Sequence, residues 1–172
     1  MGEILQTRLQ TRRDLPVGEQ VLLALGIAAG ELGSLVERVL RGRGLTSTRY
    51  NVLRILRGAG GPLSCADLGQ RLLVASPDIT RLVDPLVERG WVERDRLADD
   101  RRVVVQTLTP EGSALLAELD LPLGRLYDAV AAALGEDDAT SLIASCEQVL
   151  ELVQGGGLAE AAGEVATGSG VP

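Results

Sequence analysis

Apolar residues recur along this chain mostly at the spacing of helix faces. Between residues 17 and 40 they step alternately by four and three positions, which predicts one long helix with a single apolar stripe. The same spacing returns after Thr109-Pro110-Glu111 and again over residues 136–153. Pro122 lies inside the first of these two later stripes, where it is expected to kink or split the helix. The pattern therefore predicts long amphipathic helices on both sides of a central region.

Shorter helices are predicted in that central region. One spans residues 45–57 with Thr46 as its N-cap, and the next is capped by Ser64. A further helix is expected to begin at Ser76-Pro77, with serine as the N-cap and proline at the first helical position, and to end at Gly90. Its inward face is predicted from apolar residues at helical spacing, namely Ile79, Leu82, Val83 and Leu86.

A β-hairpin is predicted directly after this helix. Two short apolar-rich segments, residues 91–94 and 103–108, flank a charged tip at residues 95–102. The tip carries Arg96, Arg101 and Arg102, and three arginines on one hairpin favour an anionic partner such as a DNA groove. A hairpin that follows a helix-turn-helix-like pair predicts a winged helix.

The expected fold class is therefore mainly α with a small β-hairpin wing: a winged helix-turn-helix flanked by long dimerisation helices. The small central unit cannot cover the apolar stripes of the long helices, so a homodimer is expected. Five parts are predicted: a flexible N-terminus at 1–16, an N-terminal dimerisation helix at 17–44, a DNA-binding lobe at 45–109, C-terminal dimerisation helices at 110–154 and a disordered tail at 155–172.

Composition argues against an enzyme. Histidine is absent, which removes the commonest general base, and the two cysteines form no CxxC pair. No metal site and no cofactor are expected. The longest apolar run, residues 21–30, is too short to span a membrane and is followed by Glu31, and the N-terminus lacks the layout of a signal peptide. We expect a cytoplasmic protein with no membrane partner.

The net charge of −7 is unevenly distributed. Residues 41–102 hold twelve arginines against eight acidic residues, a balance of +4. Residues 103–172 hold one arginine against eleven acidic residues, a balance of −10. Because affinity for phosphate depends on local charge, double-stranded DNA is the expected partner of the central lobe.

Two segments resemble the MarR (multiple antibiotic resistance regulator) family. ADLGQRLLVASPDITRLVDPLVERGWVERD, residues 66–95, is similar to that family's helix-turn-helix and first wing strand, and DRRVVVQTLT, residues 100–109, fits its DxRxxxxxLT wing signature. The resemblance implies a homodimeric regulator, usually a repressor. Its recognition helices would enter the major grooves, and its wings the minor grooves, of a pseudo-palindromic operator. A small phenolic or other aromatic effector is also implied.

Candidate DNA contacts on the recognition helix are the residues that lie off its inward face: Ser76, Asp78, Thr80, Arg81 and Asp84. Arg81 can form a bidentate pair with guanine, and Thr80 can bond a phosphate or touch a thymine methyl group. The alternative is that Arg81 is only a solvated charge.

In the wing, the resemblance places the minor-groove arginine at Arg102 and its orienting carboxylate at Asp100. Arg96 and Arg101 are expected to contact phosphates. The alternative is an ordinary hairpin salt bridge, which contributes little at a surface. For Arg49, Arg54 and Arg57, in the helix at 45–57, phosphate contact and a solvated face stay equally open.

Three residues of the recognition helix depart from the pattern. Pro85 removes a backbone hydrogen bond where relatives usually carry a basic residue, at a cost of about 3 kcal/mol in a regular helix. Asp78 and Asp84 put negative charge on the face expected to meet DNA. These departures favour an alternative function, a winged-helix dimer that binds a protein partner and has weak or lost DNA binding.

The cysteines and aromatic residues suggest little specific chemistry. Cys146 lies on an apolar stripe, where an inert buried thiol is expected, and Cys65 is the better candidate for a reactive thiol at the start of a helix. Redox sensing is nevertheless the minor interpretation. Tyr50 and Trp91 are expected to pack in the core rather than to clamp a ligand, and we predict no specific ligand.

Overall fold

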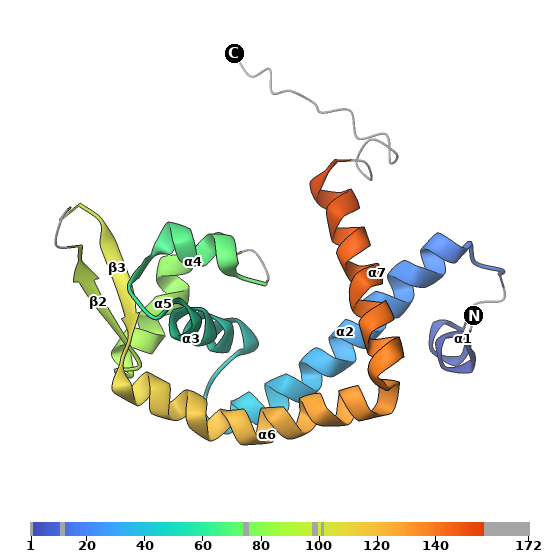
Figure 1. Cartoon of the computed structure of the whole chain (residues 1–172), viewed down its shortest axis with the longest axis horizontal. Coiled ribbons are helices and arrows are strands. Elements are labelled where there is room, and N and C mark those ends of the chain that lie inside the picture. Colours follow the sequence, from blue (N-terminus) through green and yellow to red (C-terminus); the bar gives the residue numbers. More distant parts are fainter. Residues whose placement is uncertain (1, 11–12, 74–75, 98–99, 101, 157–172) are drawn as a thin grey trace, which may run out of the picture. The chain divides into compact units, whose positions relative to one another are not determined.

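The computed structural model describes residues 2–10, 13–73, 76–97, 100 and 102–156. Over these residues the chain is mainly helical with one small sheet (Figure 1). The helices are α1 (Glu3–Leu9), α2 (Val17–Arg41), α3 (Ser47–Ala59), α4 (Cys65–Arg71), α5 (Ile79–Glu88), α6 (Pro110–Leu134) and α7 (Glu136–Gln154). The strands are β1 (Leu63–Ser64), β2 (Val92–Arg96) and β3 (Val104–Leu108). The predicted fold class, mainly α with a β-hairpin wing, is confirmed.

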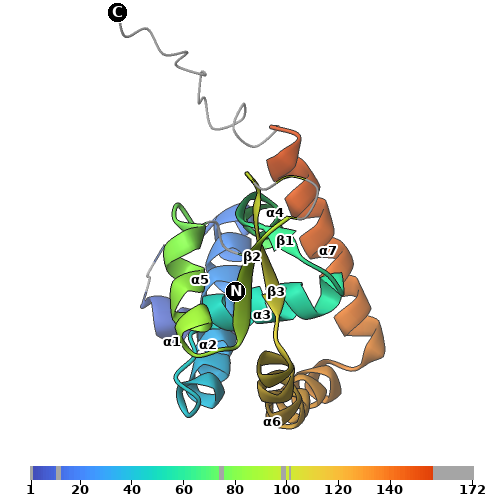
Figure 2. The same ribbon diagram turned by 90° about the vertical axis from the view of Figure 1, so that its left-hand side faces the viewer.

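The sheet is antiparallel, with β3 in the centre between β1 and β2. Strands β2 and β3 form the predicted hairpin, with Val92 opposite Leu108 at its base and Arg96 opposite Val104 at its outer end. The two-residue strand β1, which the sequence pattern did not predict, adds Leu63 opposite Gln106. In Figure 2 the hairpin faces the viewer, and α5 lies beside β2.

One aliphatic core holds the lobe together. Its fully buried side chains come from every helix of the lobe and from α6, and they include Leu53 of α3, Leu68 of α4, Val83 and Leu86 of α5 and Leu116 of α6. Ile79 and Leu82 pack against this cluster from the same face of α5, so the predicted inward face is confirmed. Burial of each such side chain contributes about 1.5–3 kcal/mol, and together they fix which face of α5 points outward.

Two predicted helix caps are confirmed. The Thr46 hydroxyl accepts a hydrogen bond from the Arg49 amide at 3.3 Å. Ser64 and Asp67 form a full capping box: the Ser64 hydroxyl accepts from the Asp67 amide, and the Asp67 carboxylate accepts from the Ser64 amide and hydroxyl. Those bonds from Ser64, the hydroxyl first, lower the pKa of Asp67.

The predicted start of the recognition helix α5 is wrong by two residues. Ser76 and Pro77 precede the helix, and Asp78 is the N-cap, with its carboxylate accepting a hydrogen bond from the Arg81 amide at 3.0 Å. A carboxylate satisfies this cap as well as serine and also meets the positive end of the helix. The end at Gly90 is confirmed: the amides of Gly90 and Trp91 donate to the carbonyls of Val87 and Leu86, the Schellman arrangement.

Neither proline ends its helix, so of the two outcomes expected at Pro122, a kink or a split, the split does not occur. Helix α5 continues past Pro85 to Glu88, and α6 continues past Pro122 to Leu134. Packing of the flanking residues offsets the lost hydrogen bonds, since Leu86 and Leu123 are fully buried. The N-terminus also differs from expectation, because residues 3–9, for which no regular structure is predicted, form α1.

The chain divides into two compact units at Leu123–Gly124. Within the second unit, no residue of α7 is buried, and Leu142, Ile143, Leu150 and Val153 expose between 45% and 60% of their surface. Of the predicted tail at 155–172, residues 157–172 lie outside the described part.

Helix α2 corrects one expectation about membranes. Its length and composition are sufficient to cross a bilayer, with a mean hydropathy of 1.4 over its most apolar 18 residues, none of them buried. A helix that packs in a protein core or forms an oligomer seam meets the same criterion, because both need a long apolar face. A count of consecutive apolar residues does not reveal that α2 is long and apolar enough to cross a bilayer, because Glu31 interrupts the apolar run.

Candidate nucleic-acid interface

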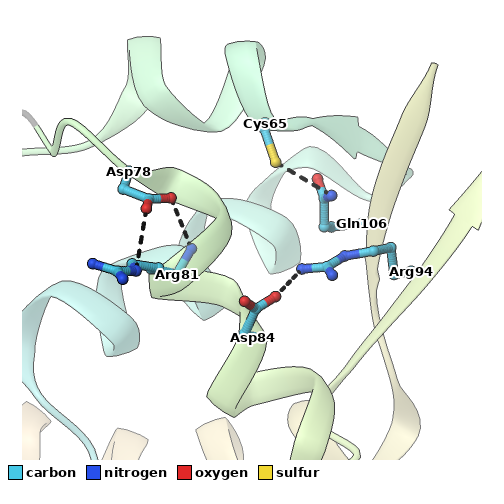
Figure 3. Close-up of polar contacts among 6 residues, drawn as sticks. All are labelled: Cys65, Asp78, Arg81, Asp84, Arg94 and Gln106. Carbon is cyan, nitrogen blue, oxygen red and sulfur yellow. Dashed lines mark hydrogen bonds and ion pairs between the residues drawn. The ribbon is translucent and has the colours of Figure 1, made fainter. Parts of the chain in front are cut away.

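The outward face of α5 presents the recognition-helix candidates. Thr80 and Arg81 are exposed, and the Arg81 side chain retains 87% of its free surface. Ser76 is half-buried ahead of the helix, and Asp78 is committed to the cap. Figure 3 shows the Asp78 carboxylate bonded to the Arg81 amide and 3.5 Å from the guanidinium of the same residue. The charge of Asp78 is therefore partly compensated within the helix.

Asp84 is paired with the wing. Its carboxylate accepts a hydrogen bond from the Arg94 guanidinium of β2 at 2.6 Å, and both side chains are partly buried (Figure 3). A charge-assisted bond between α5 and β2 fixes the hairpin against the helix. The predicted repulsion between Asp84 and DNA is therefore reduced, because an arginine neutralises this carboxylate.

The wing keeps its candidates on exposed positions. Arg96 ends β2 opposite Val104, so it lies on the paired strand and not on the tip itself. Arg102 is exposed, and its amide donates to the Asp100 carboxylate at 3.0 Å. Asp100 thus orients Arg102 through the backbone of the turn, whereas the sequence suggested an effect on the guanidinium. Arg101 lies outside the described residues.

A polar lock at the base of the wing was not predicted from the sequence. Thr109 is buried; its hydroxyl donates to the Gly90 carbonyl at 2.7 Å and accepts from the Gly112 amide at 3.0 Å. Its own amide donates to the Trp91 carbonyl at 3.1 Å. Through its side chain and its amide, Thr109 therefore joins the end of the recognition helix and the residue before β2 to the first turn of α6. The threonine of the LT signature was the available signal.

We expect Thr109→Val to lower the free energy of unfolding by about 2 kcal/mol, because the cap at Gly112 and the acceptor at Gly90 both lose their partner. Chemical denaturation at a fixed protein concentration measures the change. Thr109→Ser keeps the hydroxyl and should recover most of the loss. A loss in Thr109→Ser without a loss in Thr109→Val would show that the methyl group, not the hydroxyl, is responsible.

A second link joins the recognition helix to the loop before α3. The Arg89 guanidinium stacks over the Trp91 ring at 5.0 Å and donates to the Arg43 carbonyl at 3.2 Å. It lies so close to Gly44 that a Cβ at this residue would be 2.6 Å from a guanidinium nitrogen. Arg43 in turn forms a 2.8 Å ion pair with Glu118 of α6. The position of α5 is thus tied to the loop between α2 and α3 and, through Arg43, to α6.

The arginines of α3 are partly used within the lobe. Arg57 forms a bidentate pair with Asp120 of α6 at 2.8 and 3.0 Å. This hydrogen bonding lowers the pKa of Asp120 and raises that of Arg57. The Arg54 guanidinium lies over the Tyr50 ring, 5.8 Å from its centre. These contacts favour structural roles for Arg54 and Arg57, while Arg49 stays a candidate phosphate contact.

Cys65 faces a buried amide. Gln106 of β3 is fully buried, and its side-chain nitrogen donates a weak 3.5 Å hydrogen bond to the Cys65 sulfur, while its amide oxygen has no hydrogen-bond partner (Figure 3). Cys65 and Cys146 are both free thiols of intermediate exposure. Cys146 is therefore less buried than predicted.

Because an unpaired buried amide opposes folding, we expect Gln106→Met to raise the free energy of unfolding by about 1 kcal/mol. Gln106→Glu should instead destabilise the lobe at neutral pH, since it buries a charge at the same place. Urea denaturation of both variants measures these effects. Destabilisation by methionine would indicate that the amide is bonded in solution.

Other site types can be surveyed over the described part of the chain. There, no group of three or more His, Cys, Asp or Glu side chains is placed to hold a metal ion. One open cavity of about 360 Å³ lies between the end of α3, the end of β3 and the start of α6. Leu56, Arg57, Thr109 and Ser113 contribute to its walls. Its volume lies within the range of small-molecule sites.

A helix-turn-helix whose second helix is bonded to a β-hairpin defines a winged helix-turn-helix protein. The family model described as the MarR family matches residues 45–104. The uncharacterized HTH-type transcriptional regulator YwoH of Bacillus subtilis (strain 168) is 30% identical over 95 residues, which span 55% of this chain and 68% of YwoH. The chain belongs to the MarR family, whose members are transcriptional regulators and not enzymes.

Solved structures agree with this assignment. The MarR transcription factor from Planctomyces limnophilus is 32% identical with a TM-score of 0.59, and the match covers 80% of this chain and 99% of that one. A mutant MarR from E. coli, complexed with operator DNA, is 27% identical with a TM-score of 0.69 and the same coverage. The sequence-based assignment to the family is confirmed.

Proposed function

We propose that this chain is a cytoplasmic transcriptional repressor that binds a pseudo-palindromic operator as a homodimer. The observation that carries the proposal is the outward face of α5, where Arg81 is exposed while the neighbouring Asp84 is neutralised by Arg94 of the wing. This arrangement leaves an exposed basic side chain on the face proposed to enter a groove and reduces the repulsion between Asp84 and phosphate. Support also comes from the similarity to E. coli MarR, whose complex with operator DNA is known.

The same geometry suggests how the contacts divide. Thr80 and Arg81 are assigned to base edges in the major groove, and Ser76, half-buried before the helix, to a neighbouring phosphate. Asp78 acts through the helix cap. Arg102 is assigned to the minor groove, on a turn that Asp100 shapes.

The wing also supplies contacts to the DNA backbone. Arg96, which is exposed at the outer end of β2, and Arg101 are assigned to phosphates. Both assignments predict that substitution weakens binding about equally for all DNA sequences.

Homodimerisation is supported by the exposed apolar surface of the terminal helices. In α7, Ile143 exposes 60% and Leu150 56% of its surface, and in α2 Leu22 exposes 69%. Apolar surface of this extent in several long helices is typical of an oligomer seam. A symmetric dimer places two recognition helices on successive major grooves, which is the reason to expect a pseudo-palindromic site.

A small-molecule effector is the remaining part of the proposal. The open cavity beside Arg57 and Thr109 is large enough for a small aromatic acid, and it borders the lock at the base of the wing. A ligand there would contact the end of α3, the end of β3 and the start of α6 together. Screening aromatic acids for a shift in operator affinity tests this point.

The central experiment selects bound sequences from a random DNA pool with the full-length protein and measures their affinity by fluorescence anisotropy. An inverted repeat with nanomolar to micromolar affinity and a steep loss of binding with salt is the expected result. Sedimentation of the free and bound protein should give two chains per site. Failure to enrich any sequence at low salt would contradict the proposal.

The alternative, a winged-helix dimer that binds a protein, rests on the acidic net charge and on Asp78, Asp84 and Pro85. The observed bonds of both aspartates within the lobe weaken this alternative. A stoichiometric protein complex that Arg81→Ala disrupts, together with failed sequence selection, would support it.

A further inference from the structure

Pro85 places an apolar ring beside the residue proposed to read a base. It follows Arg81 by four residues, one helical turn, and it is half-buried at the edge of the outward face. Val83 and Leu86 on either side of it are fully buried in the core, which fixes the rotation of α5 and hence the direction of the ring. Around it, the outward face carries polar side chains: Thr80, Arg81, Asp84 and Glu88.

The neighbouring charge is held away from this ring. The Asp84 carboxylate is bonded to Arg94 of β2 at 2.6 Å, on the wing side of α5 (Figure 3). At about 100° per residue, Pro85 and Asp84 are separated by about 100° around the helix, with Arg81 between them. The helix therefore presents a cationic fork and an apolar ring next to each other, with the Asp84 carboxylate bonded to the wing.

Major-groove chemistry limits what such a ring can meet. Most base edges there offer hydrogen-bond donors or acceptors, and the apolar exception is the C5 methyl group of thymine. A proline ring against a donor or acceptor would remove its water and give no bond in return. Against a methyl group the same ring buries apolar surface, and proline loses no rotamer freedom in doing so.

We propose that Pro85 is a specificity-determining residue that selects a 5-methylpyrimidine, thymine in ordinary DNA, next to the base contacted by Arg81. This inference rests on the proposed DNA-binding function and deepens it. Four residues span about 6 Å along a helix axis, and base pairs repeat every 3.4 Å, so the thymine should lie about one or two base pairs from the guanine.

The test uses the operator obtained by selection, with each thymine of one half-site replaced in turn by deoxyuridine, which lacks only the methyl group. For the wild-type protein, one replacement should weaken binding about fourfold, the change expected from one buried methyl group. Replacing the same T·A pair by 5-methylcytosine·guanine, compared with cytosine·guanine, should show a similar benefit from the methyl group. Fluorescence anisotropy measures all affinities.

Pro85→Ser provides the decisive comparison. It removes the ring but restores the backbone N–H, so α5 should be at least as stable, which thermal denaturation verifies. In this variant the effect of deoxyuridine at that position should fall below about 1.5-fold. Pro62→Ser, at an exposed proline in the turn before β1, is the matched control and should keep the full effect.

Each outcome decides the inference. If the protein selects an operator but no thymine shows a deoxyuridine effect that depends on residue 85, the inference is wrong and the proposed function stands. If the selected half-site has no thymine near the contacted guanine, the inference is likewise wrong and the proposed function stands. If no sequence is selected at all, both are overturned together.

Discussion

Substitution of Gly112 by alanine is expected to lower the free energy of unfolding by about 3 kcal/mol. A Cβ at this position would lie 2.2 Å from the Trp91 carbonyl oxygen and 2.8 Å from a Leu108 methyl carbon. The closest atom belongs to the backbone and cannot move aside by rotation. Relief requires α6 to shift away from the wing, which would also stretch the 3.0 Å bond between the Gly112 amide and Thr109.

Chemical denaturation at one protein concentration measures this loss, because dimerisation would make stability depend on concentration. Gly124→Ala is the matched control: it lies in the same helix, and its added Cβ would have no neighbour within 4 Å. Helix propensity then predicts a gain of up to about 1 kcal/mol. Similar effects from the two substitutions would contradict the close approach at Gly112.

Removal of the Arg81 guanidinium is expected to weaken operator binding about 10- to 100-fold and to relax the preference for guanine at one position of each half-site. The side chain is 87% exposed, so Arg81→Ala should leave stability almost unchanged, apart from the local pairing with Asp78. Anisotropy with the selected operator and with single-base variants measures both effects.

Arg102→Ala is expected to weaken binding to a comparable or smaller extent. The loss of affinity should be largest for operators that are A·T-rich where the wing meets the minor groove, next to the segment bound by the recognition helix. Arg125→Ala removes the same charge from an exposed position in the other compact unit and serves as the control. Equal losses for Arg81, Arg102 and Arg125 would mean that only net charge matters, and would contradict the assigned contacts.

Local signals predicted most of the architecture. The caps at Thr46 and Ser64, the inward face of α5 and the strand pairing depend on neighbouring residues, so a single sequence carries enough information for them. The prediction failed at the start of α5, where Asp78 and not Ser76 is the N-cap, because both residue types favour that position.

Contacts between elements could not be predicted in the same way. The bond between Asp84 and Arg94 joins a helix to a strand, and sequence reasoning treated that aspartate as an unpaired charge. The three bonds of Thr109 depend on the close approach of Gly90, Trp91 and Gly112 after folding. The LT signature indicated the residue, but only the structure gives it a physical role.

The lock at Thr109 also limits how the protein can be switched. The lock joins the end of α5, the wing and the first turn of α6, and the bond from Arg94 to Asp84 adds a further link between the wing and α5. We therefore expect these parts to move together as one DNA-binding unit. An effector cannot easily pull the wing away from the recognition helix. In the proposed dimer, regulation would then change the distance or angle between two intact DNA-binding units. The same ligand should therefore change the affinity in opposite directions for operators with the original and with an altered half-site spacing.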